Sequence, residues 1–196
     1  MSKNILEDRI ERLRKKMAES GIDTVMICSD ENRRYLSGYT GKDGSYDESA
    51  GILVITGKDL VLACDPRYDQ QAEQEAPLYS VVCYKKRLSE ELPGILESVG
   101  ARKVGVEDAR LTLKDYNEFI HGIEQSDLGA EIIPCSGLFK DLRIRKDDTE
   151  VDLIRKALKI AETSFLQFKE TIKEGMDEKQ AAWTLEKRMR ENGAES

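Results

Sequence analysis

Side chains that could carry out chemistry are few and scattered in this sequence. His121 is the only histidine, and we expect it near a helix C-terminus, where a protonated imidazole favours the helix dipole. No G-x-S-x-G turn, P-loop or G-x-G-x-x-G follows an expected strand. A two-metal hydrolytic site needs several convergent acids, usually with a histidine. The acids here belong to helix surfaces and caps, including Asp147 and Asp148, so the residues predict no complete catalytic or metal site.

The four cysteines are Cys28, Cys64, Cys83 and Cys135. None forms a CxxC pair, which argues against a zinc knuckle or a redox motif. The first three lie in apolar runs that we interpret as buried strands. We therefore expect reduced thiols in a hydrophobic core.

The charge balance excludes some classes of partner. The 196 residues include 31 basic and 38 acidic side chains, a net charge of −7, and no basic patch of the kind that binds nucleic acid stands out. No apolar run approaches the roughly 20 residues that cross a bilayer. The N-terminus lacks the apolar core of a signal peptide. We expect a cytoplasmic protein without nucleic-acid or membrane partners.

Hydrophobic periodicity predicts alternating helices and strands. Leu6, Ile10, Leu13 and Met17 line one face of a helix over residues 4–20. Further helices are predicted over residues 66–75, 89–98 and 112–123. Apolar runs predict strands at residues 24–28, 50–56, 60–64, 80–84, 103–106 and 131–134, with a hairpin turn at 57–59. Residues 29–49 show no sustained period and are predicted to be mostly loop. The pattern favours an α/β fold, with a mixed sheet and helices on both faces.

The composition changes after Gly137. A long helix is predicted over residues 147–173, and a second begins at Asp177 and ends at Gly193. No strand follows this pair, so its apolar faces need a partner from elsewhere. We expect Leu158, Phe165 and Leu185 to be partly exposed or covered by another copy of the chain.

Five stretches, read in order, resemble the creatinase/prolidase/Xaa-Pro aminopeptidase family of pita-bread metallopeptidases. They are Arg9–Leu13 with Gly21–Thr24, Asn32–Gly41, Asp65–Tyr68, Leu142–Glu150 with Ile154–Ala157, and Gly175–Glu178 with Gly193–Glu195. The second stretch is similar to the family's N-x-x-Y-L-[ST]-G-[FY] turn. Arg145 is a mild departure from the family's pattern, because lysine is also common at this position.

The resemblance implies a creatinase-type N-terminal domain of ribonuclease-H-like topology over residues 1–137. Residues 138–196 would then be a linker and the first two helices, a helical hairpin, of a truncated catalytic domain. In the family, two divalent metal ions (Mn, Co or Zn) are held further along that domain. The resemblance therefore places no catalytic residue, metal ligand or cofactor in this chain.

The resemblance also implies a homodimer whose N-terminal domain walls the active site of a peptidase acting on peptides with proline. Candidate rim residues for the substrate are Tyr39, Lys42, Asp43 and Tyr46, all in the glycine-rich loop 37–48. Matching residues expected to be structural are Tyr35, Gly38, Asp65, Arg67 and Tyr68.

Three interpretations remain open from the sequence. The first is an N-terminal part of an Xaa-Pro aminopeptidase or proline dipeptidase. The second is a stand-alone, non-catalytic interaction module of the same fold. The third is an α/β ligand-binding domain that uses loop 37–48.

Overall fold

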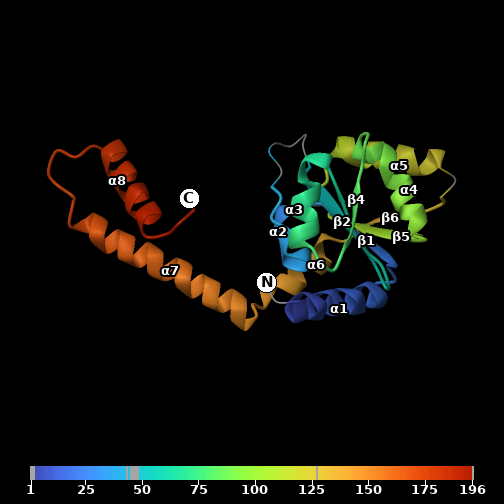
Figure 1. The fold of residues 1–196 in the computed structure, drawn as a ribbon, viewed down its shortest axis with the longest axis horizontal. Coiled ribbons are helices and arrows are strands. Elements are labelled where there is room, and N and C mark those ends of the chain that lie inside the picture. The colour runs from blue at the N-terminus through green and yellow to red at the C-terminus, as the bar shows by residue number, and fades with distance from the viewer. Residues whose placement is uncertain (1–2, 43, 45–48, 127, 196) are drawn as a thin grey trace. The chain divides into compact units, whose positions relative to one another are not determined.

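The computed structural model describes residues 3–42, 44, 49–126 and 128–195. The chain divides into two compact units, Met1–Ile144 and Arg145–Ser196. Both are drawn in Figure 1, and each is described by itself. No helix in these ranges is both long and apolar enough to cross a membrane.

A six-stranded sheet forms the centre of the first unit, with the strand order β4-β3-β2-β1-β5-β6. The strands are β1 (Thr24–Ile27), β2 (Gly51–Thr56), β3 (Leu60–Cys64), β4 (Ser80–Cys83), β5 (Lys103–Val106) and β6 (Glu131–Pro134). Only β2 runs against its neighbours, and β1, β3, β4, β5 and β6 all run in one direction. The mixed sheet and the hairpin between β2 and β3 confirm the prediction.

Helices cover both faces of the sheet, because successive strand side chains point to opposite faces. Val25 and Ile27 pack into one core. That core also holds residues of α1 (Lys3–Glu19), α2 (Asp30–Ser37), α3 (Asp69–Glu75) and α6 (Ser136–Ile144). Met26 packs into the second core, under α4 (Leu88–Ser98) and α5 (Leu113–Gln125). Figure 1 shows α4 and α5 side by side.

Helix α2 corrects the prediction of a loop after β1. Its hydrophobic period is hidden because two polar residues, Asn32 and Arg33, are buried beside Tyr35 and Leu36. The helix ends at Gly38, whose φ of 84° is the left-handed conformation typical of a glycine C-cap.

Helix α6 moves the boundary between the units from the predicted Gly137 to Ile144. Phe139 and Leu142 are buried in the first core. Lys16 on α1 pairs with Asp141 at 3.2 Å, and Arg12 donates to the Leu142 carbonyl at 3.0 Å. The segment predicted to be a linker therefore belongs to the first unit.

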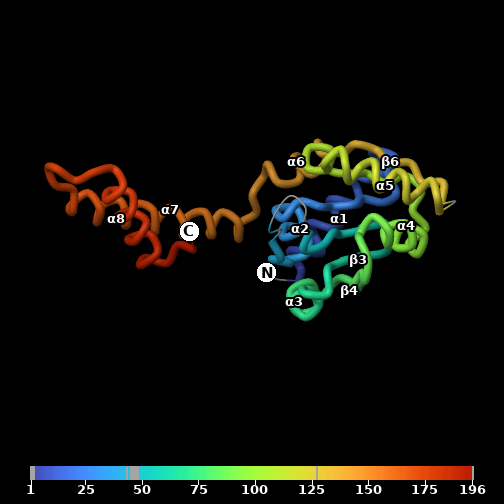
Figure 2. The backbone as a smooth tube through the Cα atoms, turned by 90° about the horizontal axis from the view of Figure 1, so that it is seen from above, coloured from blue at the N-terminus to red at the C-terminus, as the bar shows by residue number. Residues whose placement is uncertain are grey.

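The second unit is the predicted helical hairpin, formed by α7 (Asp148–Lys169) and α8 (Glu178–Glu191). Figure 2 shows the two helices running past each other. Asp147 and Glu150 form a capping box at the start of α7. Leu158 and Phe165 are 56% and 54% exposed, as predicted, and Leu185 is half-buried.

Candidate functional site

The base of the loop after α2 is tied to three other elements. Thr40 donates from its amide and its hydroxyl to the Glu75 carboxylate on α3, the amide at 2.7 Å. The Tyr39 hydroxyl donates to the Ala50 carbonyl, just before β2, at 2.9 Å. These bonds hold both ends of the loop on the unit, although residues 43 and 45–48 lie outside the described ranges.

Arg33 is the central anchor of this base and is fully buried. Its guanidinium donates to the carbonyls of Cys28 and Gly41, at 3.0 and 2.9 Å, and also to the carbonyl of Gly51. Asp30, one turn earlier on α2, forms an ion pair with it. One buried cation thus joins the end of β1, the loop and the start of β2, which fixes where the loop leaves and re-enters the sheet.

Glu75 is the acidic anchor. Partial burial opposes its ionisation, but the hydrogen bonds from Thr40 and Gln71 hold the pKa of its carboxyl below the ordinary value. The carboxylate is therefore charged near neutral pH and accepts from both side chains. This contact spans 35 residues and had no sequence signal.

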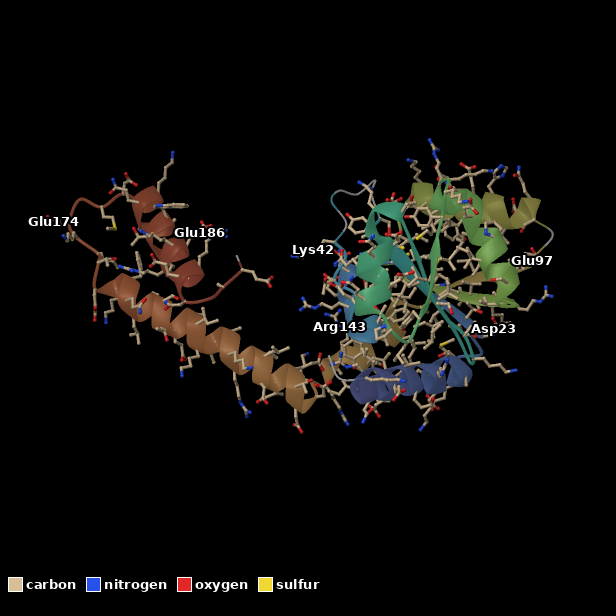
Figure 3. All side chains as sticks on the ribbon, viewed as in Figure 1. Asp23, Lys42, Glu97, Arg143, Glu174 and Glu186 are labelled. Atoms are coloured by element: carbon tan, nitrogen blue, oxygen red, sulfur yellow. The ribbon has the colours of Figure 1, made fainter. Side chains whose placement is uncertain are left out.

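The predicted rim residues do not lie together. Tyr39 is fully buried, where burial raises the pKa of its phenol, so it supports the loop from below. Lys42 is exposed at the outer edge of the first unit, as Figure 3 shows. Asp43 and Tyr46 lie outside the described residues.

The residues predicted to be structural occupy two places. Tyr35 is buried, and its hydroxyl donates to the Leu142 carbonyl at 3.2 Å, while Gly38 caps α2. Asp65 caps a short 3-10 helix (Pro66–Tyr68) and pairs with Arg67 at 2.9 Å. The hydrogen bond from the Arg67 guanidinium lowers the pKa of Asp65. The Arg67 guanidinium also lies 5.7 Å from the centre of the Tyr68 ring.

A topological switch point lies where β1 and β5 end. The two strands are parallel neighbours, but α2 follows β1 on one face and α5 belongs to the other. Ligands of open α/β sheets bind in such a crevice. Here the buried Glu107 carboxylate occupies the place at the start of α2 where such a ligand would bind. It accepts hydrogen bonds from the Cys28 and Ser29 amides at 2.6 and 2.7 Å.

Two more donors complete this arrangement. The Ser29 hydroxyl and the Asn32 amide also donate to Glu107, and Arg143 donates to the Asn32 oxygen at 3.1 Å; Figure 3 labels Arg143. The start of α2 therefore binds the chain's own carboxylate rather than a phosphate. Sequence reasoning missed Glu107, because only the pairing of β1 with β5 brings it to α2.

A cleft of about 980 Å³ opens beside this point, along the edge where the parallel strands end. Five basic side chains line it (Arg67, Lys86, Arg87, Arg110 and Lys114), with five acidic ones (Asp30, Glu31, Asp65, Asp115 and Glu118). Arg110 pairs with Glu31 at 2.7 Å, and Arg67 pairs with Asp65. The charges on its walls thus balance, and none of its described lining residues is a histidine.

The described residues do not supply a metal centre. Among them, no three His, Cys, Asp or Glu side chains lie close enough to hold a metal ion. His121 is exposed on α5, and its Nε2 lies 3.0 Å from the Gln125 side-chain nitrogen. The described geometry supports binding and positioning roles.

Comparisons with known proteins agree with this geometry. Residues 9–145 match the family Creatinase/Prolidase N-terminal domain. The chain is 30% identical to an uncharacterized peptidase, YqhT, of Bacillus subtilis, over 96% of this chain and 50% of that protein. It is 32% identical to an Xaa-Pro dipeptidase of Pyrococcus furiosus, over 97% of this chain and 50% of that protein.

Solved structures extend the likeness to three dimensions. An Xaa-Pro dipeptidase from Bacillus anthracis superimposes with a TM-score of 0.88 at 32% identity, over 97% of this chain and 50% of that chain. The likeness includes the helical hairpin as well as the first unit. The chain spans about half the length of each of these three relatives.

Proposed function

Because this chain belongs to the Creatinase/Prolidase N-terminal domain family, we propose that it forms the N-terminal half of an Xaa-Pro peptidase, an aminopeptidase or a dipeptidase. The observation that carries the proposal is the likeness to Xaa-Pro dipeptidases, which covers 97% of this chain but half of each relative. The whole protein would hydrolyse peptide bonds that involve proline, in the cytoplasm. Two divalent metal ions (Mn, Co or Zn) would be held by residues in the other half of the protein.

The first unit would wall the active site and support a homodimer. Its loop after α2 suits such a role, because Arg33, Tyr39 and Glu75 hold the base while Lys42 remains exposed. Lys42, Asp43 and Tyr46 are the proposed rim residues. Tyr39 acts beneath them as a support, since its side chain is buried.

The second unit would begin the catalytic domain. Ile154, Leu158 and Phe165 follow one another at helical spacing along one side of α7, and each is 53–56% exposed. We name these three residues the α7 stripe. Such a row of large apolar side chains is typical of a surface that another segment covers. The half of the relatives that this chain does not match is the proposed cover.

A chimera tests the proposal. Residues 1–196 are joined to the second half of the Bacillus anthracis Xaa-Pro dipeptidase, and hydrolysis of an Xaa-Pro dipeptide is measured with manganese added. The chimera is expected to hydrolyse the dipeptide, while this chain alone and the second half alone are expected not to. Light scattering measures the mass of the chimera in solution, which is expected to be that of a homodimer.

The two halves of the proposal fail in different ways. A chimera that folds as the Bacillus anthracis protein does, by circular dichroism, but hydrolyses nothing would overturn the peptidase assignment. Hydrolysis by this chain alone would overturn the assignment of the chemistry to the other half. A folded, inactive chimera would leave the interaction module as the better interpretation.

A further inference from the structure

Two cysteines meet at the ends of neighbouring strands. Cys64 ends β3 and Cys83 ends β4, and the two are register partners in this parallel pair. Their Sγ atoms are 3.7 Å apart, and both thiols are free. Both side chains contact the same hydrophobic core, so both point to one face of the sheet.

We propose that Cys64 and Cys83 form a dithiol site that hydrogen peroxide oxidises to an intramolecular disulfide. The sequence predicted reduced core thiols, because the cysteines form no CxxC pair and lie in apolar runs; Cys64 and Cys83 are 19 positions apart. The strand register removes that separation. It places one thiol beside the other without any change of fold.

The geometry permits the bond. Neighbouring strands lie about 4.8 Å apart, which is within the range of Cα separations of about 4.4–6.8 Å seen in disulfides. The sulfur atoms must approach by about 1.6 Å to reach a bond length of about 2.05 Å. Side-chain rotation supplies most of that movement, and β4 can supply the rest because it is an edge strand.

The two thiols differ in access, and this sets the order of the steps. Cys64 is fully buried, while Cys83 is half-buried on the edge strand. Peroxide therefore reaches Cys83 first. The Cys83 thiolate attacks one peroxide oxygen and the O–O bond breaks, which gives a sulfenic acid. The departing hydroxide takes up the proton that the Cys83 thiol released and becomes one water.

The second step closes the disulfide. The Cys64 sulfur attacks the Cys83 sulfur, the S–O bond breaks, and the oxygen leaves as a second water with the proton from Cys64. Two thiols and one peroxide thus become one disulfide and two waters. Burial, and then the hydrogen bond with Cys83, raise the pKa of Cys64 to about 12. Because a protonated thiol is a weaker nucleophile than a thiolate, the second step is expected to be the slower of the two.

The crosslink would act on the loop described above. It closes a segment that contains the 3-10 helix and α3, and α3 carries Glu75, the partner of Thr40. Joining the ends of this segment reduces the freedom of its unfolded state. The oxidised protein is therefore expected to melt several degrees higher than the reduced protein.

Peptide mapping under non-reducing conditions tests the proposal on the whole chain treated with hydrogen peroxide. A peptide pair linking Cys64 to Cys83 is expected, with two of the four thiols lost and both recovered with dithiothreitol. In Cys64→Ser, oxidation is expected to stop at a Cys83 sulfenic acid, which dimedone traps. Cys28→Ser is the matched control, because Cys28 is another half-buried thiol at a strand end. The Cys28→Ser variant should form the Cys64–Cys83 disulfide as the unmodified chain does.

Circular dichroism first shows that each variant is folded. In folded protein, the absence of the Cys64–Cys83 peptide pair would overturn the proposal. Conversion of Cys83 to sulfinic acid in the unmodified chain would overturn it too, because it would mean that Cys64 does not reach the sulfenic acid. A Cys64→Ala variant repeats the trapping measurement if Cys64→Ser fails to fold.

Discussion

Replacing Glu107 by alanine should destabilise the first unit far more than a typical surface glutamate does. The buried carboxylate accepts four hydrogen bonds at the start of α2, from the Cys28 and Ser29 amides, the Ser29 hydroxyl and the Asn32 amide. Alanine leaves all four donors without this acceptor. The two side-chain donors can turn toward other acceptors, but the two backbone amides cannot.

The magnitude follows from those two amides. A buried donor left unsatisfied costs about 1–3 kcal/mol, so we expect Glu107→Ala to lower the free energy of unfolding by about 3 kcal/mol. Glu107→Gln keeps one acceptor oxygen and the shape of the side chain. It should therefore cost about half as much.

The assay can isolate the first unit. All seven tyrosines lie within residues 1–144, and the single tryptophan, Trp183, lies on α8. In a Trp183→Phe background, tyrosine fluorescence during urea unfolding therefore reports on the first unit alone. Glu31→Ala is the matched control, because Glu31 forms an exposed ion pair with Arg110 at the same cleft. Such pairs contribute at most about 1 kcal/mol.

The reasoning would be refuted by a Glu107→Ala loss of less than about 1 kcal/mol, equal to that of Glu31→Ala. Amide hydrogen exchange gives a second reading. The amides of α2 should exchange faster in Glu107→Ala, while those of α5 should not. Uniform acceleration across the unit would show that the carboxylate does not act locally on α2.

Three further predictions concern other parts of the chain. Gly51→Ala should lower the free energy of unfolding by about 2–3 kcal/mol, since Gly51 has a φ of 152° and an added Cβ would lie 2.7 Å from the Ala63 carbonyl oxygen. Urea unfolding measures this loss, with Gly57→Ala as the control, because an added Cβ at Gly57 meets no other atom within 4 Å. Phe165→Glu should reduce binding of an apolar dye to the α7 stripe, and unchanged dye fluorescence would contradict an accessible stripe. The folded-state pKa of Glu75 is lowered, so its contribution to stability is present above its ordinary pKa and is lost as the pH falls through the folded value. The urea midpoint should accordingly fall less between about pH 5 and pH 3 in Glu75→Gln than in the unmodified chain, and equal slopes would refute this.

Local patterns were sufficient to predict most of the regular structure. The strands Leu60–Cys64, Lys103–Val106 and Glu131–Pro134 have the predicted bounds, because each contains a short run of apolar residues. The helix α1 and the hairpin of α7 and α8 were predicted for a similar reason. Their apolar residues recur at helical spacing, and Asp147 marks the start of α7.

Predictions failed for two helices whose partners lie far away in the sequence. Helix α2 presents Asn32 and Arg33 to the interior, so no hydrophobic period marks it as a helix. Helix α6 was read as linker, although Phe139 and Leu142 pack against the first core. In both cases the stabilising partners, such as Glu107 and Arg12, lie far away in the sequence.

The amino-acid sequence by itself determined most of the strands, the helices α1, α7 and α8, and the family to which the chain belongs. Only the tertiary structure decided which distant groups meet. Glu107 reaches α2 because β1 and β5 are parallel neighbours, and Cys64 meets Cys83 because β3 and β4 are in register. Local periodicity reports which face of an element avoids water, whereas strand order and register determine the partner, and these depend on the packing of the whole sheet.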